Sequence, residues 1–193
     1  MTESIDTMTV RDAIYGRCSV RAYAPEQIDH LTLSTLLAAA VRAPTAMHGE
    51  PWQFVIIQDA DVLKRLSDRA KELISADAAR LHPHRGGLDI FSQTGFNVFY
   101  DARTLVIICT KIAGHFALAD CWLAAQNLML AAHAMGLGTC VIGSAALALN
   151  LPDVKLELGI PPETTAVAPI IVGKPRSQTL PSARNEPIIV AWR

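Results

Sequence analysis

The sequence predicts an α+β fold in which a buried β-sheet is covered by helices. Three almost continuous apolar runs, at residues 53–58, 104–110 and 165–172, are typical of strands buried on both faces. Elsewhere apolar residues recur at helical spacing, but strands and helices do not alternate strictly. No strand is followed by the Gly-x-Gly-x-x-Gly turn of a dinucleotide-binding βαβ unit. With 193 residues, 51% of them hydrophobic, the chain can bury the core of a single domain, which we expect over residues 1–193.

The helices follow from caps, breakers and periodicity. Thr9 is a favourable N-cap, and Asp12 three residues on completes a capping box. Pro44 disfavours helical geometry at the residue before it, so the second helix ends near Ala43. A long, mostly apolar helix must be buried against other elements or another subunit. The helices are expected at residues 9–17, 33–43, 59–74, 117–135 and 152–158.

Two segments do not fit a regular element. Residues 75–101 contain Pro83, paired glycines and several aromatic residues, and we interpret them as a mobile excursion that could act as a lid over a pocket. The tail at residues 174–193 is polar and broken by prolines, except for the apolar residues 188–190. A single apolar strand after an open tail needs a sheet edge to join, so we expect the tail to reach a partner subunit.

Composition and charge exclude several classes of function. The net charge is −1 without a block of like charge, so neither a nucleic-acid groove nor a polybasic membrane surface is expected. No apolar run approaches the roughly 20 residues that span a bilayer, and no signal-peptide pattern is visible. The four cysteines form no Cys-x-x-Cys pair, and His82 and His84 have no third ligand in view. We therefore expect a reduced, cytoplasmic protein without a metal site.

A basic loop after the first helix could hold a phosphate group. Arg17 and Arg21 stand four residues apart, with Cys18 and Ser19 between them. A guanidinium group can bind two phosphate oxygens through two parallel hydrogen bonds, and the serine hydroxyl supplies a further donor. From this motif alone, a solvated surface loop is the more common interpretation.

Two further loops offer contacts for a ligand. Residues 42–54 pass from a helix end through a polar loop, with Thr45, His48 and Glu50 as donors and acceptors, into a buried strand. At residues 136–144 we expect a turn, or a short strand and loop, in which glycines let backbone amides approach a flat ligand. A plain helix cap followed by a turn is the alternative there. Arg184 carries no signal by itself.

The order and spacing of these motifs resemble the nitroreductase-like FMN-dependent oxidoreductase family over nearly the whole chain. The motifs that carry the resemblance are the Arg-x-Ser-x-Arg loop at 17–21, the segment 43–54, Gln126-Asn127-Leu128, the glycine turn at 136–143, the turn at 158–161, the strand at 169–173 and Arg184. The resemblance implies a nitroreductase-like fold: a central, mostly antiparallel sheet flanked by helices, with C-terminal segments exchanged between the subunits of a homodimer.

The resemblance also implies FMN as cofactor. It assigns Arg17, Cys18, Ser19 and Arg21 to the loop that contacts the phosphate, ribityl chain and pyrimidine edge, and Arg184 to the phosphate. Pro44, Thr45 and Ala46 would line the flavin, with His48 and Glu50 at its ring edge. The backbone amides of Ile142, Gly143 and Ser144 would lie near flavin N5.

The implied reaction takes hydride from NADH or NADPH through flavin N5 to an electron-poor small molecule, such as a nitroaromatic, quinone or enone. The cofactor performs this chemistry, so no catalytic side chain is predicted. His48 and Glu50 depart from the asparagine and glutamine usual in the family, and Ser182 from a basic residue of many relatives. These departures leave two alternatives open: a specialised flavin enzyme that acts on one metabolite or uses oxygen, and a flavin-binding protein without reductase turnover.

Overall fold

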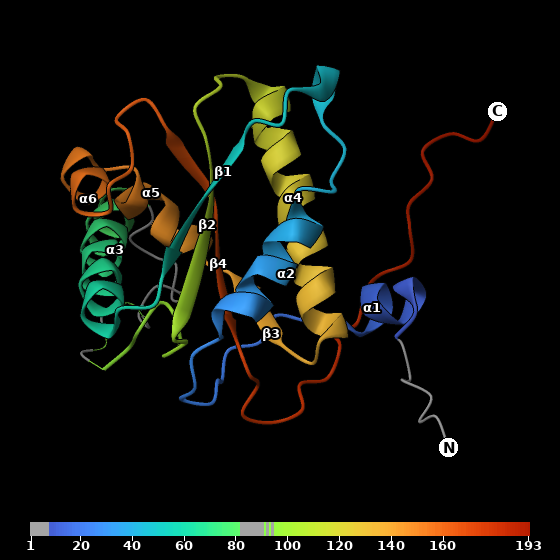
Figure 1. Cartoon of the computed structure of the whole chain (residues 1–193), viewed down its shortest axis with the longest axis horizontal. Coiled ribbons are helices and arrows are strands. Elements are labelled where there is room, and N and C mark those ends of the chain that lie inside the picture. The colour runs from blue at the N-terminus through green and yellow to red at the C-terminus, as the bar shows by residue number, and fades with distance from the viewer. Residues whose placement is uncertain (1–7, 82–90, 92, 94) are drawn as a thin grey trace.

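The computed structural model describes residues 8–81, 91, 93 and 95–193, and these form a four-stranded antiparallel sheet with helices on both faces (Figure 1). The strand order is β1-β2-β4-β3, and every neighbouring pair is antiparallel. The strands are β1 (Trp52–Ile57), β2 (Thr104–Thr110), β3 (Gly138–Val141) and β4 (Thr165–Gly173). The prediction of an α+β fold with an antiparallel central sheet is confirmed.

The two faces of the sheet are covered by different helices. All seven residues of β2 are buried, which requires cover on both sides. Alternate β2 side chains therefore enter two separate cores: Leu105 and Ile107 pack with α3 (Ala60–Leu81), whereas Val106 and Ile108 pack with α2 (His30–Ala40) and α4 (His115–Ala134). Two short helices, α5 (Ala146–Leu149) and α6 (Pro152–Glu157), lie beside α3 (Figure 1).

Helix boundaries follow the predicted caps at the N-terminus of the chain and shift elsewhere. The capping box of Thr9 and Asp12 begins α1 (Val10–Gly16), as expected. Helix α2 begins at His30, before the expected position, because the Asp29 carboxylate accepts the N–H of Thr32 at 2.9 Å. Helix α5 was not predicted.

The segment expected to be a mobile excursion begins as helix. Helix α3 continues to Leu81, so the expected end at residue 74 is wrong. Val98 and Phe99 are fully buried and belong to the core. Residues 82–90, 92 and 94 lie outside the described residues, and the lid stays a prediction.

The C-terminal tail leaves the body of the protein soon after β4. The Arg176 N–H donates to the Ala22 carbonyl at 3.0 Å, and Pro175 bridges to Tyr23. The tail is exposed from residue 177 onward, and its end projects to the upper right in Figure 1. Residues 188–190 form no strand within the described chain, so their pairing with a partner stays a prediction. Among the described residues, no helix has the length and apolar character that crossing a membrane requires.

Candidate functional site

The basic loop after α1 is fixed to the sheet by backbone pairing. Because β3 is an edge strand, it can accept a further segment, and Val20 donates its N–H to the Thr139 carbonyl at 3.0 Å. Ser19 also forms a parallel bridge with Thr139. Successive side chains of an extended segment point to opposite sides. Because Val20 is buried, Ser19 and Arg21 share the exposed side, and the loop presents their donors from a position set by main-chain bonds.

A glycine is required where this loop crosses β3. A Cβ built on Gly138 would lie 2.7 Å from the Cβ of Val20, closer than side-chain carbons approach one another. Val20 is also held by Tyr23, whose hydroxyl donates to the Val20 carbonyl at 2.7 Å. The glycine turn singled out in the sequence therefore lets the basic loop lie directly against the sheet.

The segment that follows β3 lies beside the same loop. Ile142, Gly143 and Ser144 line a hollow of about 80 Å³ together with Arg21 and Tyr100. The Arg21 guanidinium carbon is 5.8 Å from the centroid of the Tyr100 ring, a cation–π distance. A Cβ on Gly143 would meet no atom within 4 Å. The structure thus brings four of the predicted site residues together and leaves open space over the backbone of Gly143.

The other residues predicted near a phosphate are placed differently. Arg17 is the C-cap of α1 and lies near His133 of α4. Burial, and then the Arg17 charge, lower the pKa of His133 below its ordinary value. The Cys18 thiol donates to the Thr179 carbonyl at 3.6 Å, which keeps the start of the tail near the loop. Arg184 is exposed, and in the described part of the chain its guanidinium bonds only the adjacent Ala183 carbonyl.

The second predicted loop has a strained backbone that is held by a buried carboxylate. Met47, His48 and Glu50 have φ of 53, 56 and 39°, in the left-handed region. Such a conformation costs a non-glycine residue about 1–3 kcal/mol, and the surroundings must hold it in place. The Ala46 N–H donates to both carboxylate oxygens of Asp120, at 3.1 and 3.3 Å, and Asp120 is only 6% exposed. Asp120 therefore anchors this loop to α4.

The strained loop presents most of its predicted contact residues at the surface. Thr45 and Ala46 are half-buried, and the exposed members are Pro44, His48 and Glu50. A cavity of about 280 Å³ is lined by residues of the loop, among them Met47, and by residues at the start of α4, among them Phe116. The loop is therefore accessible to a ligand or a second chain.

The two groups of predicted residues lie at opposite ends of α4. Asp120, which holds the loop at residues 44–50, is near the first turns of this helix, and His133, beside Arg17, is in its last turn. A rise of 1.5 Å per residue separates Asp120 from His133 by about 20 Å along the axis. One chain therefore does not gather all of the predicted residues around a single small ligand.

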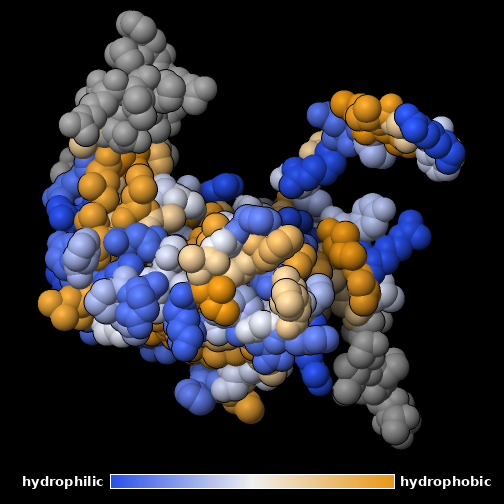
Figure 2. All heavy atoms as spheres, turned by 90° about the horizontal axis from the view of Figure 1, so that it is seen from above, coloured by the Kyte–Doolittle hydropathy of each residue, from blue (hydrophilic) through white to orange (hydrophobic). Residues whose placement is uncertain are grey.

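Apolar side chains remain exposed on the helices next to both groups and on the tail. Tyr15 of α1 is 72% exposed, and Phe116 and Trp122 of α4 are 64% and 44% exposed. On the tail, Ile188 and Trp192 are almost fully exposed, and Figure 2 shows hydrophobic atoms near the end of the arm that projects at upper right. Apolar surface of this kind marks interaction sites.

Two of the buried thiols, those of Cys109 and Cys121, do not supply a nucleophile. Burial raises the pKa of the Cys109 thiol to about 12 and that of Cys121 to about 11, so both stay protonated at neutral pH. Across residues 8–81, 91, 93 and 95–193, no group of three or more metal-ligating side chains comes together.

Sequence reasoning missed the roles of Asp120 and Tyr100. Asp120 is 74 residues from Ala46 in the chain, so only the packing of α4 beside the loop reveals their bond. The available signal was a single acidic residue inside a mostly apolar helix. Tyr100 belongs to the segment interpreted as an excursion, which offers no periodicity from which its contact with Arg21 could be predicted.

Known proteins resemble the chain in sequence and in fold. The model of the nitroreductase family matches residues 14–174. A crystal structure of a nitroreductase with bound FMN from Bacteroides fragilis is 26% identical and has a TM-score of 0.79, over 95% of this chain and 97% of that one. A Methanothermobacter thermautotrophicus protein, named as a candidate NADH dehydrogenase/NAD(P)H nitroreductase, is 26% identical over 89% of this chain and 80% of its own length. Human iodotyrosine deiodinase 1 is 25% identical over 89% of this chain and 63% of its own length.

Proposed function

Because the chain belongs to the nitroreductase family, we propose that it is an FMN-dependent oxidoreductase that passes hydride from NADH or NADPH to an electron-poor acceptor. A nitroaromatic, a quinone or an enone has the required chemistry. One observation supports this most directly: a loop with two arginines and a serine is paired to β3 beside the open backbone of Gly143. The FMN bound to the related nitroreductase from Bacteroides fragilis supports the choice of cofactor.

The residues of this chain fit the parts of FMN. Arg17, Ser19 and Arg21 would hold the phosphate, the ribityl chain and the pyrimidine edge of FMN, because guanidinium groups and a hydroxyl match a dianionic ester and the polar atoms that follow it. The backbone of Ile142, Gly143 and Ser144 would lie against the ring, since no Cβ blocks the approach to Gly143. When bound, FMN supplies the hydride-accepting chemistry, and the protein orients it and sets its electrostatic surroundings.

We also propose that each site is completed by a second copy of the chain. Within one chain the loop at residues 44–50 lies about 20 Å along α4 from the basic loop. A homodimer in which one subunit supplies the basic loop and the other supplies Pro44, Thr45, Ala46, His48 and Glu50 would bring both groups to one flavin. The exposed apolar side chains on α1, α4 and the tail are suited to such an interface, and exchanged tails would also cover residues 188–190.

The test replaces Arg17 and Arg21 with alanine together. We expect the affinity for FMN to fall by at least about 100-fold, because each charge-assisted hydrogen bond contributes about 1.5–3 kcal/mol. The absorption spectrum of the purified protein and a flavin fluorescence titration measure this loss, and circular dichroism checks that the fold is retained.

The matched control is the pair Arg65→Ala and Arg69→Ala, which removes the same charge from α3, where both arginines form exposed ion pairs. Undiminished flavin occupancy in the Arg17/Arg21 variant would refute the phosphate assignment.

Light scattering of the FMN-loaded wild type should give the mass of a dimer, and a flavin-loaded monomer would refute the shared site.

A second candidate function is a flavin enzyme specialised for one metabolite. His48 and Glu50 motivate it, because both are exposed on the strained loop and replace the residues usual in the family. The similarity to human iodotyrosine deiodinase 1 also supports it. Steady-state turnover of NADH and NADPH with a panel of quinones separates the two candidates, since FMN-loaded protein that is inert in this assay would favour the specialised enzyme.

A further inference from the structure

A larger groove, of about 510 Å³, lies between α3, the turn at residues 95–103 and the beginning of the tail. This volume is within the range of sites that bind small molecules. None of the residues assigned above to FMN lines the groove. Its charged residues are Lys64, Asp68, Lys71, Asp101, Arg103 and Arg176, four cationic and two acidic side chains in a protein whose net charge is −1.

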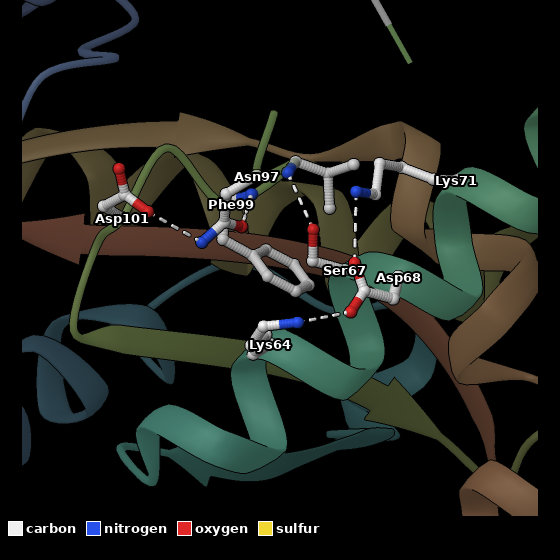
Figure 3. Close-up of polar contacts among 8 residues, drawn as sticks. Lys64, Ser67, Asp68, Lys71, Asn97, Phe99 and Asp101 are labelled. Atoms are coloured by element: carbon white, nitrogen blue, oxygen red, sulfur yellow. Dashed lines mark hydrogen bonds and ion pairs between the residues drawn. The ribbon is translucent and has the colours of Figure 1, made fainter. Parts of the chain in front are cut away.

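The positive charge of the groove is only partly neutralised from within. Asp68 accepts from Lys64 at 2.8 Å and from Lys71 at 3.1 Å, and Figure 3 shows the two ammonium groups reaching this carboxylate from different sides. These bonds lower the pKa of Asp68, so it stays ionised. One carboxylate between two lysines leaves an excess positive charge, and the Lys71 side chain is only 15% exposed.

Two arginines add to this excess. Arg103 comes directly before β2, and the main chain of Arg176 is held by its N–H bond to the Ala22 carbonyl at 3.0 Å. In the described part of the chain neither guanidinium takes part in an ion pair. Guanidinium groups bind phosphate oxygens through two parallel hydrogen bonds, so these two side chains are suited to a phosphorylated ligand.

The wall of the groove opposite α3 is held in shape by hydrogen bonds. The buried Ser67 hydroxyl accepts the N–H of Val98 at 3.0 Å, which fixes the turn to α3 (Figure 3). The Asn97 side chain accepts from the N–H of Phe99 at 2.9 Å and donates to Asp101 at 3.0 Å. A ligand would therefore bind a groove whose wall is already formed.

The groove also contains apolar surface. Leu63 of α3 and Phe96 line it, and the Phe96 ring packs edge-to-face against Tyr100 at 5.6 Å between centroids. The side chain of Phe96 also lines the hollow beside Gly143, so the groove adjoins the proposed flavin site. An apolar ring next to cationic side chains matches a molecule that carries both a flat base and phosphate groups.

We propose that this groove binds a nucleotide through its phosphate groups, with Arg103 and Arg176 as the principal contacts. The binding itself does not depend on the proposed reaction. The nucleotide could be the phosphate-bearing part of the reductant or a separate nucleotide, and the kinetic measurement below distinguishes these sources.

The experiment titrates ADP into FMN-loaded, desalted protein by calorimetry, so that the basic loop at residues 17–21 is already occupied. Inorganic phosphate and adenosine are titrated separately as the two halves of the probe. We expect ADP to bind and adenosine alone to bind at least about tenfold more weakly, because the charge-assisted bonds go to phosphate. The double variant Arg103→Gln/Arg176→Gln should lose at least about tenfold in ADP affinity. The control Arg69→Gln removes one charge from α3 at a residue that does not line the groove. This variant should bind ADP like the wild type.

Absence of ADP binding to the wild type at millimolar concentration would overturn the proposal, as would equal affinities in the double variant and the wild type. If the double variant does not fold, amide shifts of the wild type on ADP addition decide instead: shifts at Lys71, Asn97 and Arg176 support the groove, and shifts confined to other regions overturn it. A raised KM for NADPH in the double variant at unchanged FMN occupancy identifies the reductant as the source of the phosphates. An unchanged KM with weakened ADP binding identifies a separate nucleotide.

Discussion

The two loops that make up the candidate FMN site are held in different ways. The loop at residues 17–21 is paired to β3 through main-chain bonds, with Val20 packed against the bare backbone of Gly138. The loop at residues 44–50 forms no strand, has three non-glycine residues in the left-handed region, and is joined to α4 through the Asp120 carboxylate. The first loop depends on close packing at the sheet edge, whereas the second depends on one buried side chain.

This difference indicates what each loop can tolerate. Side chains on the exposed side of residues 17–21 can be replaced without loss of the main-chain pairing. A substitution there changes the groups that contact a ligand but not where the loop lies. At residues 44–50 a specific side chain must hold the strained backbone, so replacing that side chain also changes where the loop lies. Gly138 supports the first loop and Asp120 supports the second. Substitutions of these two residues should therefore differ in their effects on stability and on flavin binding.

The largest effect is expected for Gly138→Ala. The new Cβ would overlap Val20, and neither the strand β3 nor the paired loop can move without breaking main-chain bonds. We expect a loss of about 3 kcal/mol in the free energy of unfolding, together with weaker FMN binding. Urea denaturation and flavin titration measure the two quantities.

Gly143→Ala is the matched control for this substitution. A Cβ at Gly143 meets no protein atom within 4 Å, so the free energy of unfolding should stay within about 0.5 kcal/mol of the wild type. The same methyl group would occupy the space proposed for the flavin ring, and FMN affinity should fall. Equal stability of the two variants would show that Val20 does not pack on Gly138 as described, and full FMN affinity in Gly143→Ala would place the ring elsewhere.

An intermediate effect is expected for substitutions of Asp120, which holds the loop at residues 44–50. Asp120→Ala leaves the half-buried N–H of Ala46 without its acceptor, which should lower the free energy of unfolding by about 1–2 kcal/mol. Asp120→Asn retains an amide oxygen that can accept the same bond, so its loss should be smaller. Because the anchored loop is proposed to line the ring and not the phosphate, the flavin absorption bands and reduction potential should change more than FMN affinity. A change in affinity as large as that of the Arg17/Arg21 variant would contradict the division of roles between the loops.

The sequence predicted more of the first loop than of the second, for a physical reason. Arg17, Ser19 and Arg21 lie within five residues, so the motif can be recognised in the sequence, and the alternation of the extended segment places Ser19 and Arg21 on one exposed side. The strands at residues 104–110 and 165–172 were predictable because burial on both faces leaves a continuous apolar run. The strand at residues 53–58 was predicted from the same pattern, but β1 lies at the sheet edge and is only partly buried, so the expected burial on both faces is wrong there. The strain at Met47, His48 and Glu50 has no local signature, because it depends on Asp120 from a distant helix.

Elements that depend on tertiary contacts were placed least well. Helix α3 continues past residue 74 to Leu81, and α5, with four residues, is too short to show a helical period. Arg184 was expected near the phosphate, but the single chain leaves it exposed, and its role depends on where a partner's tail would lie. Whether Arg184 reaches a phosphate therefore stays a prediction of the dimer.

The smallest effect concerns His133, which lies beside the first loop at the end of α4. Burial, and then the charge of Arg17, lower the pKa of His133 below its ordinary value of 6.5, although the end of a helix favours the protonated ring. In the interval between the lowered folded pKa and 6.5 the unfolded chain binds more protons than the folded one. The free energy of unfolding therefore decreases as pH falls from above 6.5 through the folded pKa, and His133→Gln should remove this part of the pH dependence.

FMN phosphate bound at Arg17 would offset the neighbouring positive charge, so the pKa of His133 followed by NMR should rise when FMN is added. An unchanged His133 pKa on FMN binding would place the phosphate away from Arg17.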